Sequence, residues 1–201
     1  VVFPELAITG YPPQDLLLNN EFINENSNVL SKIAENSTKP LIIGYIRAGK
    51  KNIYNSAAIC FDGKIQSSYD KVLLPTYDVF DEERYFTSGI EPKVSTIPVG
   101  KKVLNVGLQI CEDLWDNNYN CKVSTMQKEL GADILINISA SPFHKDRLVK
   151  RRSIIEEKVK SLNLPFLYCN MVGAQDELIF DGQSIGFSDR GDLIAYGNPF
   201  E

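Results

Sequence analysis

The chain has 201 residues, of which 43% are hydrophobic and 23% are charged, and its formal net charge is -5. This length suits one domain with a sizeable core, and the composition is that of a soluble globular protein. The acidic balance gives no electrostatic case for a nucleic-acid partner. No window is apolar and long enough to cross a membrane. The basic run at residues 145–152 falls on a predicted helix, and we interpret it as a solvated face.

The four cysteines lack Cys-x-x-Cys spacing, and His144 is the single histidine. A metal site is therefore not expected. Cys60 and Cys169 fall in apolar strand-like runs and are predicted to be buried thiols, a usage that fits a reducing cytoplasm. The chain begins in mid-strand without an initiator methionine. We interpret it as part of a longer polypeptide, truncated at its amino terminus.

Strand-like and helical segments alternate along the chain. Runs rich in Ile and Val predict strands at residues 1–3, 41–47, 54–61, 65–69, 103–110, 134–139, 166–170, 184–188 and 193–195. Apolar residues spaced three and four apart predict helices at 15–36, 122–130 and 145–162. The Asp62-Gly63 pair predicts a tight hairpin turn, and residues 188–192 predict a second one. This mixture predicts an α/β layered domain with a mixed sheet.

Residues 76–98 are polar and aromatic with weak periodicity, and they predict a long loop. Loops of that length are often functional. We expect three aromatic side chains of this segment to line or cover a pocket: Phe80, Tyr85 and Phe86.

Cys111 ends an apolar strand-like run and is followed at once by Glu112 and Asp113. A thiol at a strand end is held rigidly and can still meet a substrate, so we interpret Cys111 as a nucleophile. The two carboxylates disfavour its thiolate, and a nearby cation is therefore required. Asp113 is expected to order the turn.

Glu5 and Lys71 each follow a predicted strand and are candidates for the remaining roles. Pro4 stiffens the backbone before Glu5, and partial desolvation there suits a general base. The ammonium of Lys71 can hold an oxyanion and stabilise a thiolate. Taken singly, Glu5 can also be a solvated strand-end residue, and Lys71 can be a surface lysine paired with Asp70.

Six motifs in this order resemble the nitrilase, or carbon–nitrogen hydrolase, superfamily over nearly the whole chain. Within it they are most similar to the glutaminase domain of glutamine-dependent NAD+ synthetases. The strings are Pro4–Pro12 (PELAITGYP), Asp70–Tyr77 (DKVLLPTY) with Val79–Phe86 (VFDEERYF), Cys111–Trp115 (CEDLW), Asn137–Phe143 (NISASPF) with Arg147, Asn170–Glu177 (NMVGAQDE) and Phe180–Ser184 (FDGQS).

The resemblance implies a four-layer α-β-β-α sandwich with mixed sheets, formed as a single domain by residues 1–201. It implies that Glu5 is the general base, that Lys71 holds the oxyanion and that Cys111 is the nucleophile. Glu82 is implied as an additional catalytic carboxylate. A purely structural salt bridge with Lys71 or Arg84 is the alternative for Glu82.

The resemblance also implies that glutamine is hydrolysed through a Cys111 thioester, with release of ammonia. The α-ammonium of glutamine would pair with Glu112 and its α-carboxylate with Arg147. Ser141 could instead cap the following helix, and Arg147 could be a solvated helix-face residue. The other implied glutamine-binding residues are Tyr11, Tyr77, Phe80 and Ser141.

A synthetase domain in the same polypeptide is implied as the consumer of this ammonia, in the amidation of deamido-NAD+. No cofactor and no metal are expected in the present domain. ATP and Mg are expected only in the synthetase domain, whose Ser-Gly-Gly-x-Asp-Ser loop does not occur in these residues. The resemblance further implies a homo-oligomer. The cysteine usage, charge and hydropathy described above predict a cytoplasmic protein with no nucleic-acid or membrane partner.

Three other functions are weighed against this one. A stand-alone nitrilase-type hydrolase of another small amide would keep Glu5, Lys71 and Cys111. It would not need Tyr11, Glu112 and Arg147, whose joint presence favours glutamine. An inactive scaffold is disfavoured because Glu5, Lys71 and Cys111 are all intact. A dinucleotide-binding module is disfavoured because no Gly-rich phosphate motif occurs.

Overall fold

The computed structural model describes all residues, 1–201, and contains two β-sheets that pack face to face. The first sheet has the order β1-β2-β3 and is antiparallel throughout. Its strands are β1 (Leu41–Ala48), β2 (Ile53–Phe61) and β3 (Lys64–Asp70). The β2–β3 turn has Asp62 and Gly63 at φ 51 and 71, as the predicted tight hairpin requires.

The second sheet has six strands in the order β11-β10-β7-β6-β5-β4. Strands β5, β6 and β7 run parallel, and the other pairs are antiparallel, so the predicted mixed sheet is confirmed. The strands are β4 (Val94–Val99), β5 (Lys102–Ile110), β6 (Ile134–Ser139), β7 (Phe166–Asn170), β10 (Ile185–Phe187) and β11 (Leu193–Tyr196). A separate hairpin pairs β8 (Val172–Gln175) with β9 (Leu178–Asp181).

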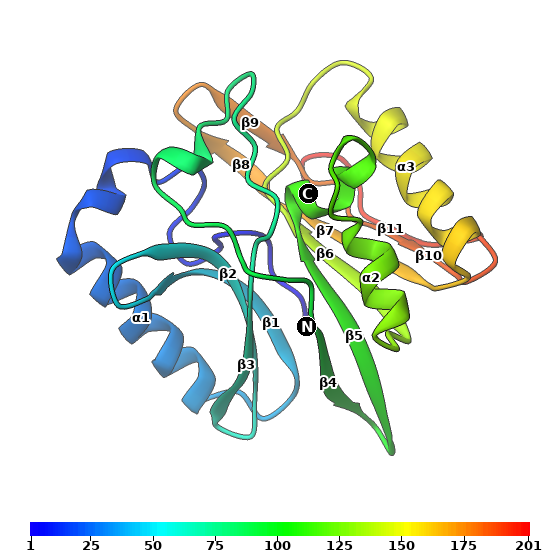
Figure 1. Ribbon diagram of the computed structural model, residues 1–201, viewed down its shortest axis with the longest axis horizontal. Helices are drawn as coiled ribbons and strands as arrows, with labels where there is room; N and C mark the ends of the chain where they lie inside the picture. Colours follow the sequence, from blue (N-terminus) through cyan, green and yellow to red (C-terminus); the bar gives the residue numbers. More distant parts are fainter.

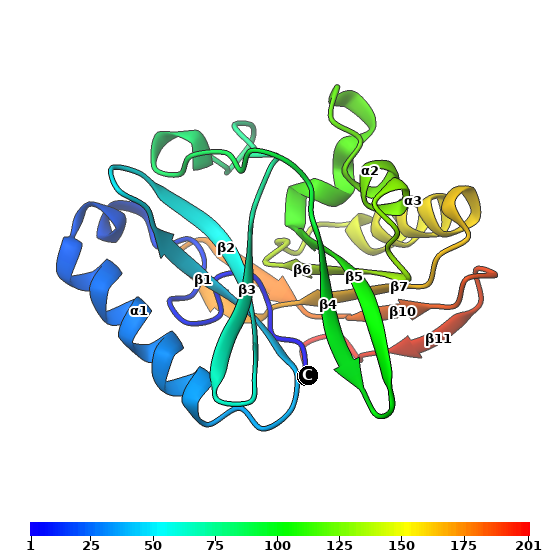
Figure 2. The same cartoon turned by 60° about the horizontal axis from the view of Figure 1, so that its bottom comes forward.

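Helices cover the outer faces of both sheets (Figure 1). Helix α1 (Asn20–Glu35) lies on the first sheet, and α2 (Val123–Glu129) and α3 (Arg147–Leu162) lie on the second. Figure 2 shows the same α-β-β-α succession from a second direction. Three 3-10 helices complete the chain: η1 (Gln14–Leu18), η2 (Glu82–Arg84) and η3 (Cys111–Asn118).

Each interface between layers is an apolar cluster. Ile59, Leu108 and Ile138 belong to the cluster between the sheets. Side chains of α1 and the first sheet form another cluster, as do side chains of α3 and the second sheet. Burial of these side chains supplies the main favourable free energy of folding. No helix of the structure has the length and apolar character that a membrane span requires.

Several predicted elements differ from the observed ones. The predicted helix at 15–36 is divided into η1 and α1, because the Asn19 side chain accepts hydrogen bonds from the Glu21 and Phe22 N–H groups and caps a new helix. The predicted strand at 1–3 is a single parallel bridge between Val2 and Ile42. Strand β4 lies inside the segment expected to be a loop, and the β8–β9 hairpin was not predicted.

Candidate active site

Three strand ends bring the polar residues of the site together. Lys71 directly follows β3, Cys111 directly follows β5, and Glu5 follows the bridge at Val2. The first residue of η2, Glu82, joins them. All four functional side chains are buried, although three of them are charged residue types. Charged side chains are buried in this way only when they are paired, so the partners define the site.

The Lys71 ammonium is shared by two carboxylates. Its Nζ lies 2.8 Å from Glu5 Oε1 and 2.8 Å from Glu82 Oε1. Burial lowers the pKa of Lys71, but Glu5 and Glu82 outweigh burial, and its pKa lies well above the ordinary value. Lys71 is therefore a fixed cation. The alternative pairing of Glu82 with Arg84 is wrong, because Arg84 lies 3.8 Å from Asp15 instead.

Both carboxylate oxygens of Glu5 are hydrogen-bonded. Oε1 accepts from Lys71 Nζ and, at 2.8 Å, from Asn55 Nδ2. Oε2 accepts from the backbone N–H of Ala140 at 2.8 Å. Glu5 has 0% exposure, so the alternative of a solvated strand-end residue is wrong.

The backbone of Glu5 rests directly on β1. A Cβ placed at Gly44 would lie 2.3 Å from the Leu6 nitrogen and 2.5 Å from the Pro4 oxygen. Only glycine permits this approach, which is one of the recognised uses of the residue within a strand. The position of Glu5 is therefore set by the first sheet.

Cys111 is 6% exposed and has φ 42, an uncommon conformation for a residue with a side chain. Burial raises the pKa of its thiol well above the usual value, Glu5 raises it further, and Lys71 opposes both. The thiol is therefore protonated at neutral pH and needs a base to react. The expectation that the acidic neighbours of Cys111 disfavour its thiolate is only partly right. Glu112 raises the pKa of the thiol, but it contributes less than Glu5 does.

Asp113 ties the segment after β5 to the segment after β3. Its Oδ1 accepts from the N–H groups of Val72 (3.2 Å) and Leu73 (2.9 Å). Its Oδ2 accepts from Tyr69 Oη (2.8 Å) and the Ile110 N–H (3.0 Å). Burial raises the pKa of Asp113 to about 6, although these donors oppose the shift. The prediction that Asp113 orders the turn is confirmed.

Glu112 is 4% exposed, and tyrosines hold both of its oxygens. Tyr77 Oη donates to Oε2 at 2.8 Å, and Tyr119 Oη donates to Oε1 at 2.9 Å. Burial raises the pKa of Glu112. It accepts no hydrogen bond from a cationic side chain, so it is a desolvated acceptor oriented by two phenols.

Arg147 and Ser141 have different surroundings. Arg147 begins α3, is half-buried, and lies over the ring of Trp115, with 5.6 Å from Cζ to the centroid. Ser141 is 4% exposed, and its Oγ accepts from Arg151 Nη2 at 3.3 Å. The alternative in which Ser141 caps α3 is wrong, since Asp146 occupies the position before that helix.

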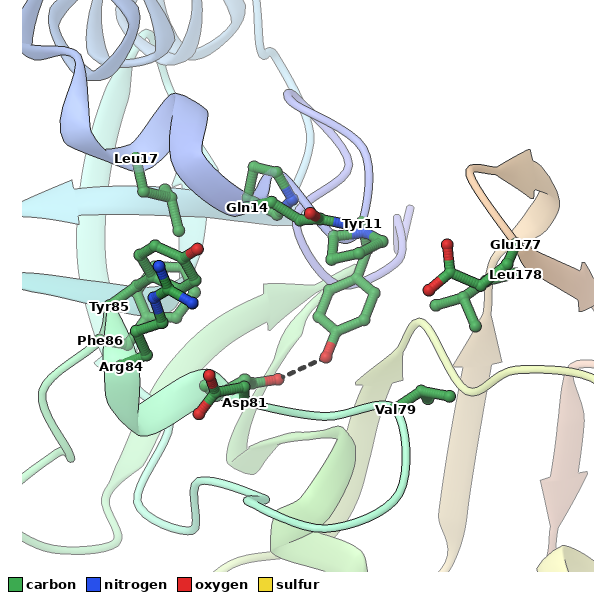
Figure 3. Close-up of a pocket in the computed structure, with 13 residues that line it drawn as sticks. Tyr11, Gln14, Leu17, Val79, Asp81, Arg84, Tyr85, Phe86, Glu177 and Leu178 are labelled. Atoms are coloured by element: carbon green, nitrogen blue, oxygen red, sulfur yellow. Dashed lines mark hydrogen bonds between the residues drawn. The ribbon is translucent and has the colours of Figure 1, made fainter.

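The aromatic residues form a connected group beside the charged cluster. The Phe80 ring lies 5.7 Å from Tyr77 and 6.4 Å from Tyr11. The Tyr11 hydroxyl donates to Glu82 Oε1 at 2.8 Å, shown by the dashed line in Figure 3. A pocket of about 210 Å³ opens over Tyr11 and Glu82 (Figure 3). Tyr85 and Phe86 line it as expected, whereas Phe80 is not among its lining residues.

Three residues of the site were not predicted. Asn55 is the third residue of β2, and Tyr119 lies in an irregular segment. No motif or hydrophobic pattern in the sequence marks either residue as part of a site. Arg151 was assigned to a solvated basic face, and that assignment is wrong. Arg151 has 0% exposure, lies 3.4 Å from Asp181 Oδ1, and touches Ser141.

A hydrolase with a thiol nucleophile needs a base and a cation beside its cysteine. The buried Glu5–Lys71 pair beside Cys111, between the two stacked sheets, has both. The chain belongs to the carbon-nitrogen hydrolase family, whose model matches residues 1–201. The chain is 41% identical to the glutamine-dependent NAD(+) synthetase of Thermotoga maritima, covering 100% of the chain and 34% of that protein. It is 36% identical to the Synechocystis enzyme of the same name, covering 98% of the chain and 38% of that protein.

Solved structures agree on the fold. The glutamine-dependent NAD+ synthetase of Acinetobacter baumannii superposes with a TM-score of 0.90 at 31% identity, covering 100% of this chain and 37% of that one. A nitrilase-superfamily amidase from Nesterenkonia superposes with a TM-score of 0.82 at 20% identity, covering 98% of this chain and 73% of that one. The chain thus spans about a third of the length of the synthetases it matches.

Proposed function

We propose that residues 1–201 form the glutamine-hydrolysing domain of a glutamine-dependent NAD+ synthetase. The buried cluster of Lys71 with Glu5 and Glu82 beside Cys111 carries this proposal. Similarity over the whole chain to synthetases of that name supports it. The rest of such a polypeptide would bind ATP and Mg and amidate deamido-NAD+. A cytoplasmic homo-oligomer is part of the same proposal.

The first half of the reaction makes a thioester. Glu5 takes the proton of the Cys111 thiol, and the thiolate attacks the side-chain amide carbon of glutamine. Lys71 and the backbone N–H of Glu112 stabilise the negative oxygen that forms. Glu5 returns the proton to the amide nitrogen, the C–N bond breaks, and ammonia leaves.

The second half regenerates the thiol. Glu5 takes a proton from water, the hydroxide adds to the thioester carbon, and the C–S bond breaks to release glutamate. Cys111 recovers its proton from Glu5. Glu82 holds Lys71 in place through both halves, since it contacts the ammonium and not the thiol.

Substrate selection is assigned to two charges at the rim of the site. Glu112 accepts hydrogen bonds from two neutral phenols. Its negative charge has no cationic hydrogen-bond partner and can pair with the α-ammonium of glutamine. Arg147 is half-buried with an aromatic ring beneath it, a setting that strengthens a contact with a carboxylate. In the same proposal, Tyr11, Tyr77 and Phe80 shape the glutamine-binding site, and Ser141 offers it a hydroxyl.

We expect the protein to hydrolyse glutamine with a kcat/KM at least about a hundredfold above that for acetamide or butyramide. These amides lack both α-groups, and each charge-assisted contact contributes about 1.5–3 kcal/mol. Steady-state assays of ammonia release with each amide measure the ratio. A preference for an aliphatic amide would favour the alternative function, a stand-alone amidase. No amide hydrolysis at all would remove the proposed activity.

Replacing Arg147 by alanine should raise KM for glutamine about ten- to a hundredfold and change kcat by less than about threefold. The expected loss is one bidentate contact with the substrate carboxylate, made equally in ground and transition states. Lys150→Ala is the matched control, because Lys150 is an exposed cation one turn along α3. An unchanged KM in Arg147→Ala would place Arg147 outside the glutamine pocket.

A further inference from the structure

Asn55 contacts every residue of the Lys71 cluster, that is, Glu5, Glu82 and Lys71. It has 0% exposure and is the third residue of β2. Nδ2 lies 2.8 Å from Glu5 Oε1 and 3.4 Å from Glu82 Oε2. The backbone carbonyl of the same residue accepts from the Lys71 N–H at 2.9 Å. One residue therefore meets both carboxylates and fixes the backbone of the cation between them.

The orientation of the Asn55 amide is determined by the charges around it. Nδ2 faces two carboxylate oxygens, and Oδ1 is buried without a hydrogen-bond partner. Turning the amide over would place Oδ1 against those oxygens, none of which can donate when ionised. An unpaired buried acceptor is unfavourable. The hydrogen bonds that Nδ2 donates to Glu5 and Glu82 therefore fix the orientation of the amide.

The cluster has fewer cations than carboxylates. Two carboxylates face one ammonium, so the fully ionised cluster carries one net negative charge in a buried place. Burial and the nearby Glu5 raise the pKa of Glu82, although Lys71 opposes them. Ionising Glu82 is therefore less favourable here than it is in water. A neutral amide donor supports the ionised form without adding a cation that would hold Glu5 more tightly.

We propose that Asn55 is a positioning residue that keeps the Glu5–Glu82 carboxylate pair ionised and holds Glu5 in reach of the Cys111 proton. This inference rests on the proposed function. Asn55 itself contacts neither the sulfur nor the pocket of Tyr11. Its effect is exerted entirely through Glu5, Glu82 and Lys71.

The first test is the pH profile of glutamine hydrolysis by Asn55→Ala. Loss of the donor disfavours ionised carboxylates, so the acid limb of kcat/KM should move to higher pH by about one unit. At pH 7, kcat should fall about tenfold or more, with KM for glutamine within about twofold. Asn55→Ser is a second variant, with a polar atom too short to reach both carboxylates, in case the alanine variant does not fold. An acid limb that does not move would overturn the proposal.

The matched control is Asn26→Ala. Asn26 is 3% exposed, and its amide bridges the backbone of Ile46, with bonds of 2.7 and 3.2 Å. Removing it deletes a buried asparagine that hydrogen-bonds to the backbone of Ile46 and to no member of the charged cluster. Its loss should lower stability and leave the pH profile in place.

A second readout does not depend on catalysis. Asn55 stabilises the native protein only when the carboxylates are ionised, so its contribution is lost as pH falls. The difference in urea midpoint between wild type and Asn55→Ala should therefore narrow from pH 8 to pH 5, whereas that of Asn26→Ala should stay constant. A constant difference for Asn55→Ala overturns the inference. A narrowing difference in a protein that hydrolyses no amide supports the inference and removes the proposed function.

Discussion

Replacing Cys111 by alanine is expected to abolish ammonia release from glutamine, with a loss on the order of 10⁴-fold or more in kcat. Cys111 is the proposed nucleophile because, of the four cysteines, it is the one whose thiol pKa both Glu5 and Lys71 shift. The loss should appear in a coupled glutamate assay. Mass spectrometry after acid quench should find a γ-glutamyl adduct on the wild-type protein and none on the variant.

Cys121→Ala is the matched control for this experiment, since Cys121 is a half-buried thiol in the irregular segment that follows η3. It should retain activity. A diazoketone analogue of glutamine should label the wild type and Cys121→Ala at one site. Stoichiometric labelling of Cys111→Ala by the same analogue would show that the nucleophile lies elsewhere.

Replacing Lys71 by methionine should both inactivate and destabilise the protein. The substitution leaves Glu5 and Glu82 buried without a cation, which costs about 3–5 kcal/mol in comparable buried pairs. Orphaned carboxylates bind protons more readily in the folded state than in the unfolded one, so stability is present at low pH and is lost as pH rises. The deficit relative to wild type should therefore be largest at pH 8 and smaller at pH 5, measured by urea denaturation.

Two further variants separate the causes. Lys64→Met removes an exposed lysine from the start of β3 and should change stability by less than about 0.5 kcal/mol. Lys71→Met combined with Glu82→Gln should recover part of the stability and none of the activity. Wild-type stability of Lys71→Met at pH 8 would mean that the ion pairs do not hold the site together.

The residues that we propose to act directly on the amide were visible in the sequence. Glu5, Lys71 and Cys111 stand where an apolar run ends, and a charged or reactive side chain at that position is unusual enough to be noticed. Asn55 was not visible, because a polar residue inside an alternating strand is normally solvent-facing. Its role depends on which face of β2 is covered by the other sheet, and that is decided by tertiary packing.

Arg151 illustrates a second limit. It lies within a run of basic residues on α3, where the pattern favours a solvated face. The structure buries Arg151 against Asp181, the last residue of β9 in the unpredicted β8–β9 hairpin. The partner of Arg151 is therefore thirty residues away along the chain. Local periodicity contains no trace of such a contact.

The fold was more predictable than the site partners, for a related reason. Strands β5, β6 and β7 are rich in apolar residues, as is typical of parallel strands covered on both faces. The sequence did not predict β4, because Pro98 and the lysine just before the strand, Lys93, interrupt its apolar pattern. As the edge strand of its sheet, β4 tolerates a proline that an interior strand would not.

The four hydrogen bonds of Asp113 bear on how this protein can change over evolutionary time. Three of its donors are backbone N–H groups, at Val72, Leu73 and Ile110. Main-chain donors survive any substitution except proline, so these three positions are free to drift among apolar residues. Substitutions of these core residues therefore leave the distance between the Cys111 thiol and the Lys71 ammonium unchanged. Selection need guard only the carboxylate of Asp113 and the phenol of Tyr69.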